Sequence, residues 1–336
     1  MADRPARLVT ALRRALVRIR ESLPLLGWIA TASIGFVAIS QAFGFTWIPA
    51  LWVLQALTPL VLGAAAPLAV IGVLTRRRTM AAVNLGVLIA LVWLVFPVVF
   101  HADPGARAPD ARPLSVVSGN VYYRTDRPDE IAAALLALDA DVIAMTEFSA
   151  PVEDAFARLD ADGRYPFVAA RAPGDRNGVA VYSRYPIIDR TIGPIGQGLA
   201  VDVVLDVDGV ATRVVVVHPL PGTDGPSLEA WSGDLAAIGT IAGPDADGAR
   251  TLIVGDFNAT RWHPAFRDLL RRGWRDAHEV LGDGWSRSWP TGGPIPPLVR
   301  IDHALVGDAV AVTDVSDVAL PGSDHRGFVV TVAIDP

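Results

Sequence analysis

The chain carries two long apolar stretches near its N-terminus and much shorter apolar runs after them. Residues 22–75 hold no formally charged side chain, and residues 79–102 hold none either. A helix that crosses a bilayer needs about 20 predominantly apolar residues, so the first stretch can supply two such helices and the second can supply one. The pattern therefore predicts three transmembrane helices, at residues 23–43, 47–74 and 80–100.

The placement of arginine predicts the orientation of these helices. Six arginines precede the first predicted helix, and Arg76, Arg77 and Arg78 lie between the second and the third, whereas the segment between the first two helices carries none. Cytoplasmic loops carry the excess of basic residues, so both basic clusters are expected in the cytoplasm and everything after His101 outside the cell membrane. The alternative, a cleaved signal peptide followed by a buried core, would account only for the first apolar stretch.

Beyond residue 113, short apolar runs alternate with segments of helical spacing. Residues 103–113 form a connector rich in Pro, Ala and Arg, which reaches at most about 35–40 Å and would hold the following domain near the membrane. Many strands with intervening helices predict a layered α/β domain at 114–336, after a membrane domain at 1–102 and the linker at 103–113. Strands are expected at 114–118, 141–146, 179–183, 199–205, 213–217, 251–254, 301–306, 309–315 and 328–334, and helices at 128–138, 152–159 and 227–241.

Composition and charge agree with two modules in different surroundings. Of the 336 residues, 51% are hydrophobic and 19% are charged, fewer charges than the roughly 25% of a typical soluble domain. The formal charge is +7 over residues 1–100 and −13 over residues 101–336, and the acidic second half argues against a nucleic-acid binder. The absence of cysteine excludes disulfides, thiolate zinc sites, iron–sulfur clusters and a cysteine nucleophile.

Polar side chains follow the apolar runs of the second half at the points where these runs stop. Because strand ends can meet at one edge of a sheet, we expect these side chains to lie together. Carboxylate and amide oxygens suit a hard divalent cation such as Mg²⁺, and a histidine with a carboxylate partner can stay charged beside a phosphate. These side chains are Asn120, Glu147, His218, Asp256, Asn258, Asp302, His303, Asp324 and His325.

Each of these residues also has a purely structural interpretation. Glu147 can cap the following helix, Asp256 and Asn258 can belong to a turn, and Asn177-Gly178 is a common turn dipeptide. The remaining candidates for structural or surface positions are His101, His263, His278, Trp262 and Trp285.

The motifs themselves resemble a known family. They are NV at Asn120, E at Glu147, RNGVAVYSRYP at 176–186, HP at His218, GDFN at 255–258, IDH at 301–303 and SDHR at 323–326. In order and spacing this series resembles the endonuclease/exonuclease/phosphatase superfamily over residues 114–336. The resemblance implies a four-layered α/β sandwich of the DNase I type. The whole plan, three spans followed by this domain, is similar to the membrane-anchored actinobacterial type linked to teicoplanin resistance, the VanJ type.

The resemblance also implies a role for each residue and a divalent metal, Mg²⁺ or Mn²⁺. Glu147 would be the main metal ligand with Asn120 beside it. Asp324 would bind the metal itself or contact a residue that binds it. Asp256 would activate the attacking water, and His325, oriented by Asp302, would donate to the phosphoryl oxygen. His303 stands where many relatives carry an aromatic residue and is not expected to be catalytic. The remaining residues, implied to contact the phosphate, are His218, Asn258 and Asn177.

These observations lead to one expected function and two alternatives. The expected protein is a metal-dependent phosphoesterase or phosphatase outside the cytoplasmic membrane, acting on a lipid-linked or small phosphorylated substrate. A lipid-linked phosphate or pyrophosphate of cell-wall synthesis would fit the tether, and a link to glycopeptide resistance follows only from the resemblance. The alternatives are an extracellular nuclease and a non-catalytic ligand-binding membrane module. Nucleic acid and an obligate protein partner are not expected.

Overall fold

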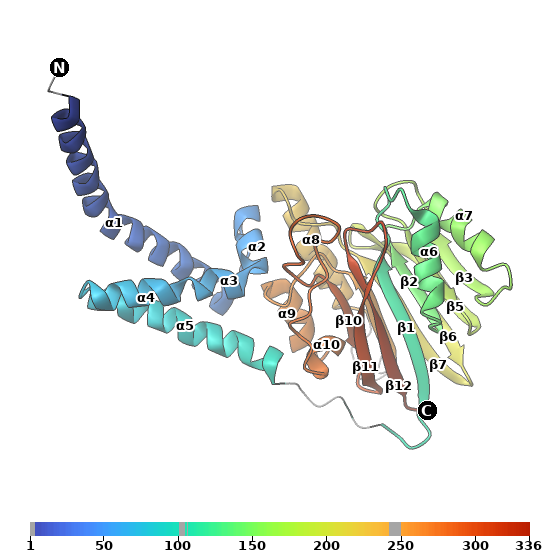
Figure 1. The fold of residues 1–336 in the computed structure, drawn as a ribbon. Coiled ribbons are helices and arrows are strands. Elements are labelled where there is room, and N and C mark those ends of the chain that lie inside the picture. Colours follow the sequence, from blue (N-terminus) through green and yellow to red (C-terminus); the bar gives the residue numbers. More distant parts are fainter. Residues whose placement is uncertain (1–3, 101–104, 106, 242–249) are drawn as a thin grey trace. The chain divides into compact units, whose positions relative to one another are not determined.

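The protein was analysed as a computed structural model that describes residues 4–100, 105, 107–241 and 250–336 (Figure 1). The chain forms two compact units, one of Met1–Phe45 with Thr58–Val95 and one of Thr46–Leu57 with Phe96–Pro336. The second unit includes residues 46–57, whereas the sequence predicted a single membrane domain at 1–102. His101 and residues 103, 104 and 106 of the predicted linker lie outside the described residues.

The first unit consists of helices that are apolar except for the arginine-rich start of the first helix and for Arg78. They are α1 (Arg4–Phe43), α3 (Thr58–Gly63), α4 (Ala65–Leu74) and most of α5 (Arg78–Val99). Within the described residues, two helices are long and apolar enough to cross a membrane, at Pro24–Phe43 and Arg78–Phe96. These two correspond to the first and third predicted spans. A third is reached only if the bent pair Pro49–Ala56 plus Thr58–Leu74 counts as one span.

The second predicted span, 47–74, is not one continuous helix. It is divided into α2 (Pro49–Ala56), α3 and α4. Pro59 and Pro67 explain the breaks, because a proline ring inside a helix clashes with the carbonyl four residues earlier and supplies no N–H. Each proline stands in the first turn of the following helix, where a missing N–H needs no intrahelical partner.

Two pairs of polar side chains form hydrogen bonds inside the apolar unit. Asn84 donates from Nδ2 to Oγ1 of Thr31 at 2.9 Å, and Gln41 donates from Nε2 to Oγ1 of Thr58 at 2.6 Å. All four side chains are buried. Such bonds between helices satisfy polar groups that would otherwise be stranded in an apolar environment.

The second unit is built on two six-stranded sheets. The parallel pairs are β1 with β2 and β7 with β8, and the other neighbours run antiparallel. The first sheet has the order β11-β12-β1-β2-β4-β3, with β1 Arg112–Asn120, β2 Val142–Thr146, β3 Phe167–Arg171, β4 Val179–Ser183, β11 Val310–Ala319 and β12 Arg326–Ile334. The second has the order β5-β6-β7-β8-β10-β9, with β5 Ile187–Ile195, β6 Gly198–Val207, β7 Val210–His218, β8 Thr251–Asp256, β9 Arg275–Asp276 and β10 Asp302–Val306.

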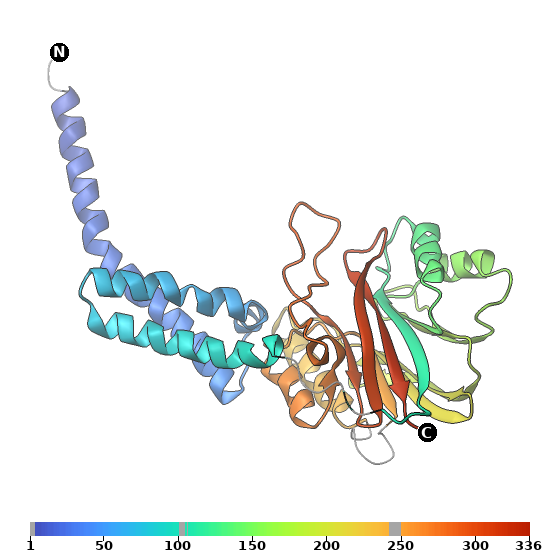
Figure 2. The ribbon, with the colours of Figure 1, turned by 60° about the horizontal axis from the view of Figure 1, so that its bottom comes forward.

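The sheets pack face to face, and helices cover their outer faces. Alternate residues of a strand point to opposite faces, so Val201 and Val203 of β6 and Val330 and Val332 of β12 enter the core between the sheets. The outer face of the first sheet packs on α6 (Pro128–Ala137) and α7 (Ala150–Leu159), and that of the second on α8 (Gly225–Ile238) and α9 (Pro264–Arg271). Figures 1 and 2 show these helix pairs on opposite sides of the strands. The predicted four-layered α/β sandwich is confirmed.

Helix α2 packs against the sandwich through Trp52. Its ring stacks on the imidazole of His263, with centroids 5.3 Å apart, and meets the ring of Trp231 edge-on at 5.9 Å. Nε2 of His263 donates to the backbone oxygen of Trp52 at 3.0 Å. These contacts explain why residues 46–57 belong to the unit that carries the sheets rather than to the apolar helices.

Candidate active site

The polar residues predicted at strand ends come together at one edge of the sandwich. Asn120 ends β1, Glu147 follows β2, His218 ends β7 and Asp256 ends β8, and these strands form two parallel pairs. Asp302 opens β10 directly opposite Asp256, because β10 runs antiparallel to β8. His325 immediately precedes β12, which runs antiparallel to β1. The topology therefore directs side chains from both sheets to one place.

Asp256 is the centre of this group. Its Oδ2 accepts a hydrogen bond from Nδ2 of Asn120 at 3.1 Å and lies 3.6 Å from Nε2 of His218 and 3.7 Å from Nε2 of His325. Nδ2 of Asn120 also lies 3.3 Å from Oε1 of Glu147. All but Glu147 are buried side chains, so their charges act on one another through little water.

Asp302 and His325 form the second part of the site. Nδ1 of His325 donates to Oδ2 of Asp302 at 2.9 Å, which leaves Nε2 facing Asp256. Burial disfavours the imidazolium, but the carboxylates of Asp302 and Asp256 outweigh it and raise the pKa of His325 to about 10. His325 is therefore charged at neutral pH and can donate from Nε2 to an anionic oxygen.

The pKa values of the groups around this histidine are shifted both by burial and by the charges of their neighbours. Burial opposes ionisation of Asp256, yet the neighbouring His325 and His218 lower its pKa, so it stays a carboxylate. Burial also opposes the charged form of His218, but the bond to Asp256 and the charge of Glu147 raise its pKa. For Asp302 burial dominates, and the pKa is raised despite His325.

Three residues of the site adopt a strained backbone. The φ angles are 54° at Glu147, 47° at Asn258 and 53° at Tyr122. The left-handed region costs a residue with a side chain about 1–3 kcal/mol and occurs preferentially at functional sites. At Glu147 the bend turns the chain from β2 so that Oε2 accepts the backbone N–H of Tyr123 at 3.1 Å.

These side chains open into a cavity of about 560 Å³, which is within the range of roughly 300–1,000 Å³ typical of small-ligand sites. Polar lining comes from Glu147, His218, Asp256, Asn258, Asp324, His325, Arg124 and Arg176. Apolar and aromatic lining comes from Trp52, Val53, Ala56, Leu57, Tyr122, Tyr123, Trp289, Leu298, Val299 and Ile301, among others. The candidate catalytic side chains thus occupy one part of a larger and partly apolar space.

A family model described as the endonuclease/exonuclease/phosphatase family matches residues 117–325. The chain belongs to this family. Its members are typically metal-dependent phosphoester hydrolases, and the family resemblance inferred from the motifs is confirmed. The matched segment contains Asn120, Glu147, His218, Asp256 and His325, so the edge described above is part of the family domain.

Solved structures support the family fold. An endonuclease/exonuclease/phosphatase from Beutenbergia cavernae has 20% identity, with 67% of this chain and 72% of that chain covered, and a TM-score of 0.53. A functionally unknown conserved protein from Enterococcus faecalis V583 has 16% identity over 66% of this chain and all of the other, with a TM-score of 0.53. D. rerio TDP2 complexed with single strand DNA product has 15% identity over 66% and 98%, with a TM-score of 0.54. Among curated proteins, none matches the chain at a significant level.

The family domain brings most of the predicted site residues together, but three of them do not line the cavity: Asn120, Asp302 and Asn177. Asn120 and Asp302 are hydrogen-bonded to the lining residues Asp256 and His325, respectively. Asn177 does not line the cavity in the described part of the chain, whereas its neighbour Arg176 does and accepts the Nδ1–H of His218 on its backbone oxygen at 3.0 Å. Arg124 also lines the cavity. Sequence reasoning assigned no role to either arginine, although Arg176 is the first residue of the RNG motif and Arg124 lies four residues after Asn120.

The structure places His303 behind the site of this family member. It is fully buried, its Nδ1 lies 2.6 Å from Oδ2 of Asp276, and its Nε2 lies 2.8 Å from the backbone oxygen of Ala259. These two contacts fix the orientation of the ring. His303 therefore holds the segment that follows Asp256 and Asn258.

The carboxylates of the site are better placed to bind a hard divalent cation than His325 is. Asp256, Asp302 and His325 have possible ligand atoms within 4.8 Å of one another, but the Nδ1–H of His325 is donated to Asp302 and the charged ring offers no lone pair. The carboxylates of Glu147 and Asp256 instead converge on Nδ2 of Asn120. Two carboxylates around one point fit a cation such as Mg²⁺.

The predicted third metal ligand, Asp324, is placed differently. Its side chain is 45% exposed, it lines the cavity, and its Oδ1 lies 4.0 Å from Nε2 of His325. It therefore lies beside His325 and is more exposed to solvent than His325 is.

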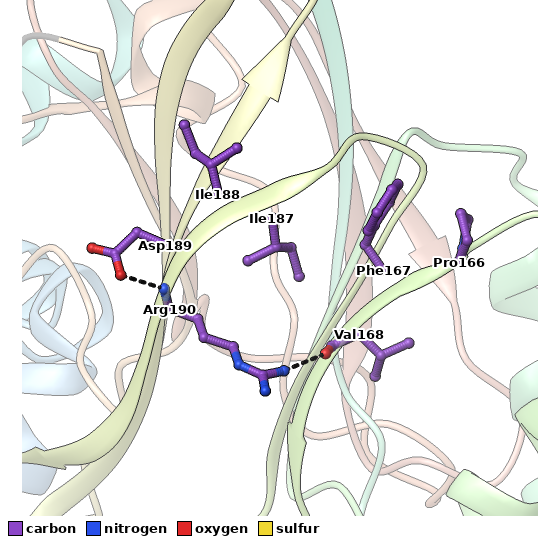
Figure 3. A pocket seen from close by; sticks show the side chains of 7 residues that line it. All are labelled: Pro166, Phe167, Val168, Ile187, Ile188, Asp189 and Arg190. Carbon is purple, nitrogen blue, oxygen red and sulfur yellow. Dashed lines mark hydrogen bonds between the residues drawn. The ribbon is translucent and has the colours of Figure 1, made fainter.

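A second cavity of about 460 Å³ lies between the edge strands β3 and β5 (Figure 3). Its two charged residues are already engaged. Oδ1 of Asp189 accepts the backbone N–H of Arg190 at 2.8 Å, and Nη1 of Arg190 donates to the backbone oxygen of Val168 at 3.3 Å. Both charged side chains of this cavity are thus bonded within the protein.

Proposed function

We propose that this protein is a membrane-anchored, metal-dependent phosphoesterase or phosphatase that acts outside the cytoplasmic membrane. The observation that carries the proposal is the convergence of Glu147, His218, Asp256 and His325 on one cavity, with Asp256 within 3.7 Å of both imidazoles. Carboxylates and charged imidazoles together suit hydrolysis of an anionic ester, because water must be activated while negative charge is neutralised.

The residues divide this work between them. The carboxylate of Asp256 can accept a hydrogen bond from the attacking water and orient it. His325 can donate from Nε2 to a phosphoryl oxygen, since Asp302 holds its Nδ1 at 2.9 Å. His218 and the cavity-lining Arg124 and Arg176 add positive charge. A divalent cation held by the carboxylates of Glu147 and Asp256 would supply Lewis-acid stabilisation of the phosphate charge when bound.

The proposed location and substrate rest on the N-terminal half. Two or three helices are apolar enough to cross a membrane, and the arginine distribution favours a catalytic unit outside the cell. A hydrolase at the outer membrane surface has access to the lipid-linked phosphates and pyrophosphates of cell-wall synthesis. The resemblance to the teicoplanin-resistance type favours the same class of substrate. A deletion strain with unchanged glycopeptide susceptibility would argue against the cellular part of this proposal.

A nuclease is the second candidate. It is favoured by the similarity of the fold to D. rerio TDP2, whose structure contains a single strand DNA product. It is opposed by the −13 formal charge over residues 101–336, because non-specific binding of nucleic acid depends on basic residues.

The deciding experiment is a substrate screen with the full chain in detergent and Mg²⁺. The screen contains phosphomonoesters, phosphodiesters, pyrophosphates, isoprenoid phosphates and single-stranded oligonucleotides. Asp256→Ala and His325→Ala should each lose most of the turnover, whereas Asp189→Ala, at an exposed residue of the second cavity, should keep it. A folded protein that cleaves only oligonucleotides would favour the nuclease. An inert wild type would leave a ligand-binding module, and full turnover in both variants would refute the site.

A further inference from the structure

The catalytic cavity has an apolar wall that comes from α2. Trp52, Val53, Ala56 and Leu57 line the cavity, and in the sequence α2 lies between the apolar helices α1 and α3. Val53 is 48% exposed, so part of the wall is open to a molecule that enters. Apolar surface that is continuous with a charged catalytic end indicates a ligand with both characters.

The segment after β8 holds this wall in place. Nε2 of His263 donates to the backbone oxygen of Trp52 at 3.0 Å, and Nδ1 of the same ring accepts the backbone N–H of Thr260 at 2.8 Å. The segment that begins with Asp256 thus carries both the catalytic carboxylate and the histidine that fixes α2. The wall and the carboxylate therefore have a defined spacing.

Apolar lining also comes from a second segment of the same unit. Trp289, Leu298 and Val299 precede β10 and line the cavity, and Trp289 is joined to Val299 by an antiparallel bridge. Trp289 is 39% and Leu298 38% exposed. Together with α2, this segment gives the cavity apolar surface from two separate parts of the chain.

We propose that α2 forms a subsite for a hydrocarbon chain, so that the preferred substrate is a phosphate ester or anhydride of a long-chain alcohol. This inference rests on the proposed function, because the chain is positioned by a phosphate at Asp256 and His325. Such a chain leaves water when it lies against Trp52 and Val53, which favours binding. An oligonucleotide would instead bring charged phosphates to the apolar wall. These phosphates would lose their hydration there, which disfavours binding.

The experiment compares substrates that share a headgroup and differ in chain length. Dimethylallyl and farnesyl pyrophosphate form one pair, and the monophosphates of the same alcohols form the other. With the full chain in detergent and Mg²⁺, kcat/KM should be at least ~10-fold higher for the longer member, a ratio that corresponds to about 1.4 kcal/mol. Val53→Asn and Leu57→Asn should each reduce this ratio severalfold.

Val168→Asn provides the matched control. Val168 is 37% exposed and lines the other cavity, so the same substitution there should leave the ratio at its wild-type value. A wild-type ratio near one would overturn the inference, and so would a ratio that survives both Val53→Asn and Leu57→Asn. Hydrolysis of the short substrates would show in either case that the proposed function stands.

An inert wild type would contradict the proposed function and leave binding as the test of the subsite. Retention of radiolabelled farnesyl monophosphate by the full chain is then compared with that of the dimethylallyl compound. Chain-length-dependent retention that Val53→Asn weakens and Val168→Asn does not would support the subsite. Equal retention of the two compounds would overturn it.

Discussion

Acid should weaken the sandwich through His263, the residue that fixes α2. Burial lowers the pKa of His263 to about 4, from an ordinary value of 6.5. The neutral ring accepts the Thr260 N–H on Nδ1 and donates to the backbone oxygen of Trp52 from Nε2. A proton on Nδ1 would make that nitrogen a donor that faces the Thr260 N–H, and the hydrogen bond between them would be lost. The unfolded chain therefore binds this proton more readily than the folded chain does.

The sign and size of the effect follow from linkage. Because the folded pKa is the lower one, the stabilising contribution is complete above pH 6.5 and is lost as pH falls toward 4. A difference of about 2.5 in pKa amounts to roughly 3 kcal/mol in full, of which about 2 kcal/mol is lost by pH 5. For a domain of this size, that loss lowers the unfolding temperature by about 4–8 °C.

The assay is thermal unfolding of the detergent-solubilised full chain, followed by near-UV circular dichroism between pH 7.5 and pH 5. Other groups titrate in this range, so the informative quantity is the difference in pH dependence between the wild type and His263→Asn. The variant should unfold at a lower temperature at pH 7.5 and should lose less on acidification, because asparagine does not titrate. Parallel pH profiles for the two proteins would refute the reasoning.

Asp302→Asn removes the charge 2.9 Å from Nδ1 of His325, so phosphate release should fall by ~10²–10⁴-fold with an unfolding temperature near that of the wild type; retained turnover would contradict the orienting role. Gly178→Ala would place a Cβ 1.7 Å from the backbone oxygen of Phe148 and should cost about 1–3 kcal/mol in urea unfolding, whereas Gly233→Ala, whose Cβ meets nothing within 4 Å, should gain about 0.5–1 kcal/mol on its helix. EDTA should abolish hydrolysis and added Mg²⁺ or Mn²⁺ should restore it, and activity that resists EDTA would contradict a divalent metal.

The central strands of the sandwich could be predicted from the sequence because they are continuous or alternating apolar runs. Val142–Thr146 and Thr251–Asp256 are buried along their whole length, and such runs leave little choice of structure. The edge strands β3 and β5 were not predicted. Most of β5 is exposed or half-buried, and it contains Gly193 and Pro194, so its hydrophobic period is lost where only one neighbour pairs with it.

The short helices were also missed, for a related reason. Helix α9 (Pro264–Arg271) has only eight residues, and α10 (Ala277–Val280) has four. Helices of that length gain little from their own hydrogen bonds and depend on packing. Their existence follows from contacts such as those of Phe266 and Leu269 with the second sheet, which no local pattern displays.

The candidate site was predictable to the extent that strand order brings distant motifs together. Motif order led to Asp256, Asp302 and His325, and the sheet register then explains their contact, because Asp302 pairs with Asp256 across β10 and β8. Side-chain direction could not be predicted in the same way. Of the adjacent residues Arg176 and Asn177, the first lines the cavity and the second does not. The backbone conformation of the turn before β4 decides which of the two side chains faces the cavity.

Helix α2 shows why hydropathy alone does not decide what an apolar segment packs against. The residues that suit a helix to lipid also suit it to a protein surface, since both environments remove apolar side chains from water. Two features break the ambiguity here: Pro59, which interrupts the helix after Leu57, and Trp52, whose ring finds Trp231 and His263 as partners. His263 is hydrogen-bonded both to Trp52 of α2 and to the backbone N–H of Thr260. Thr260 and His263 belong to the segment that follows Asp256. A displacement of α2 must therefore also act on the segment next to the Asp256 carboxylate. The apolar wall and the candidate active site are in this sense one structural element.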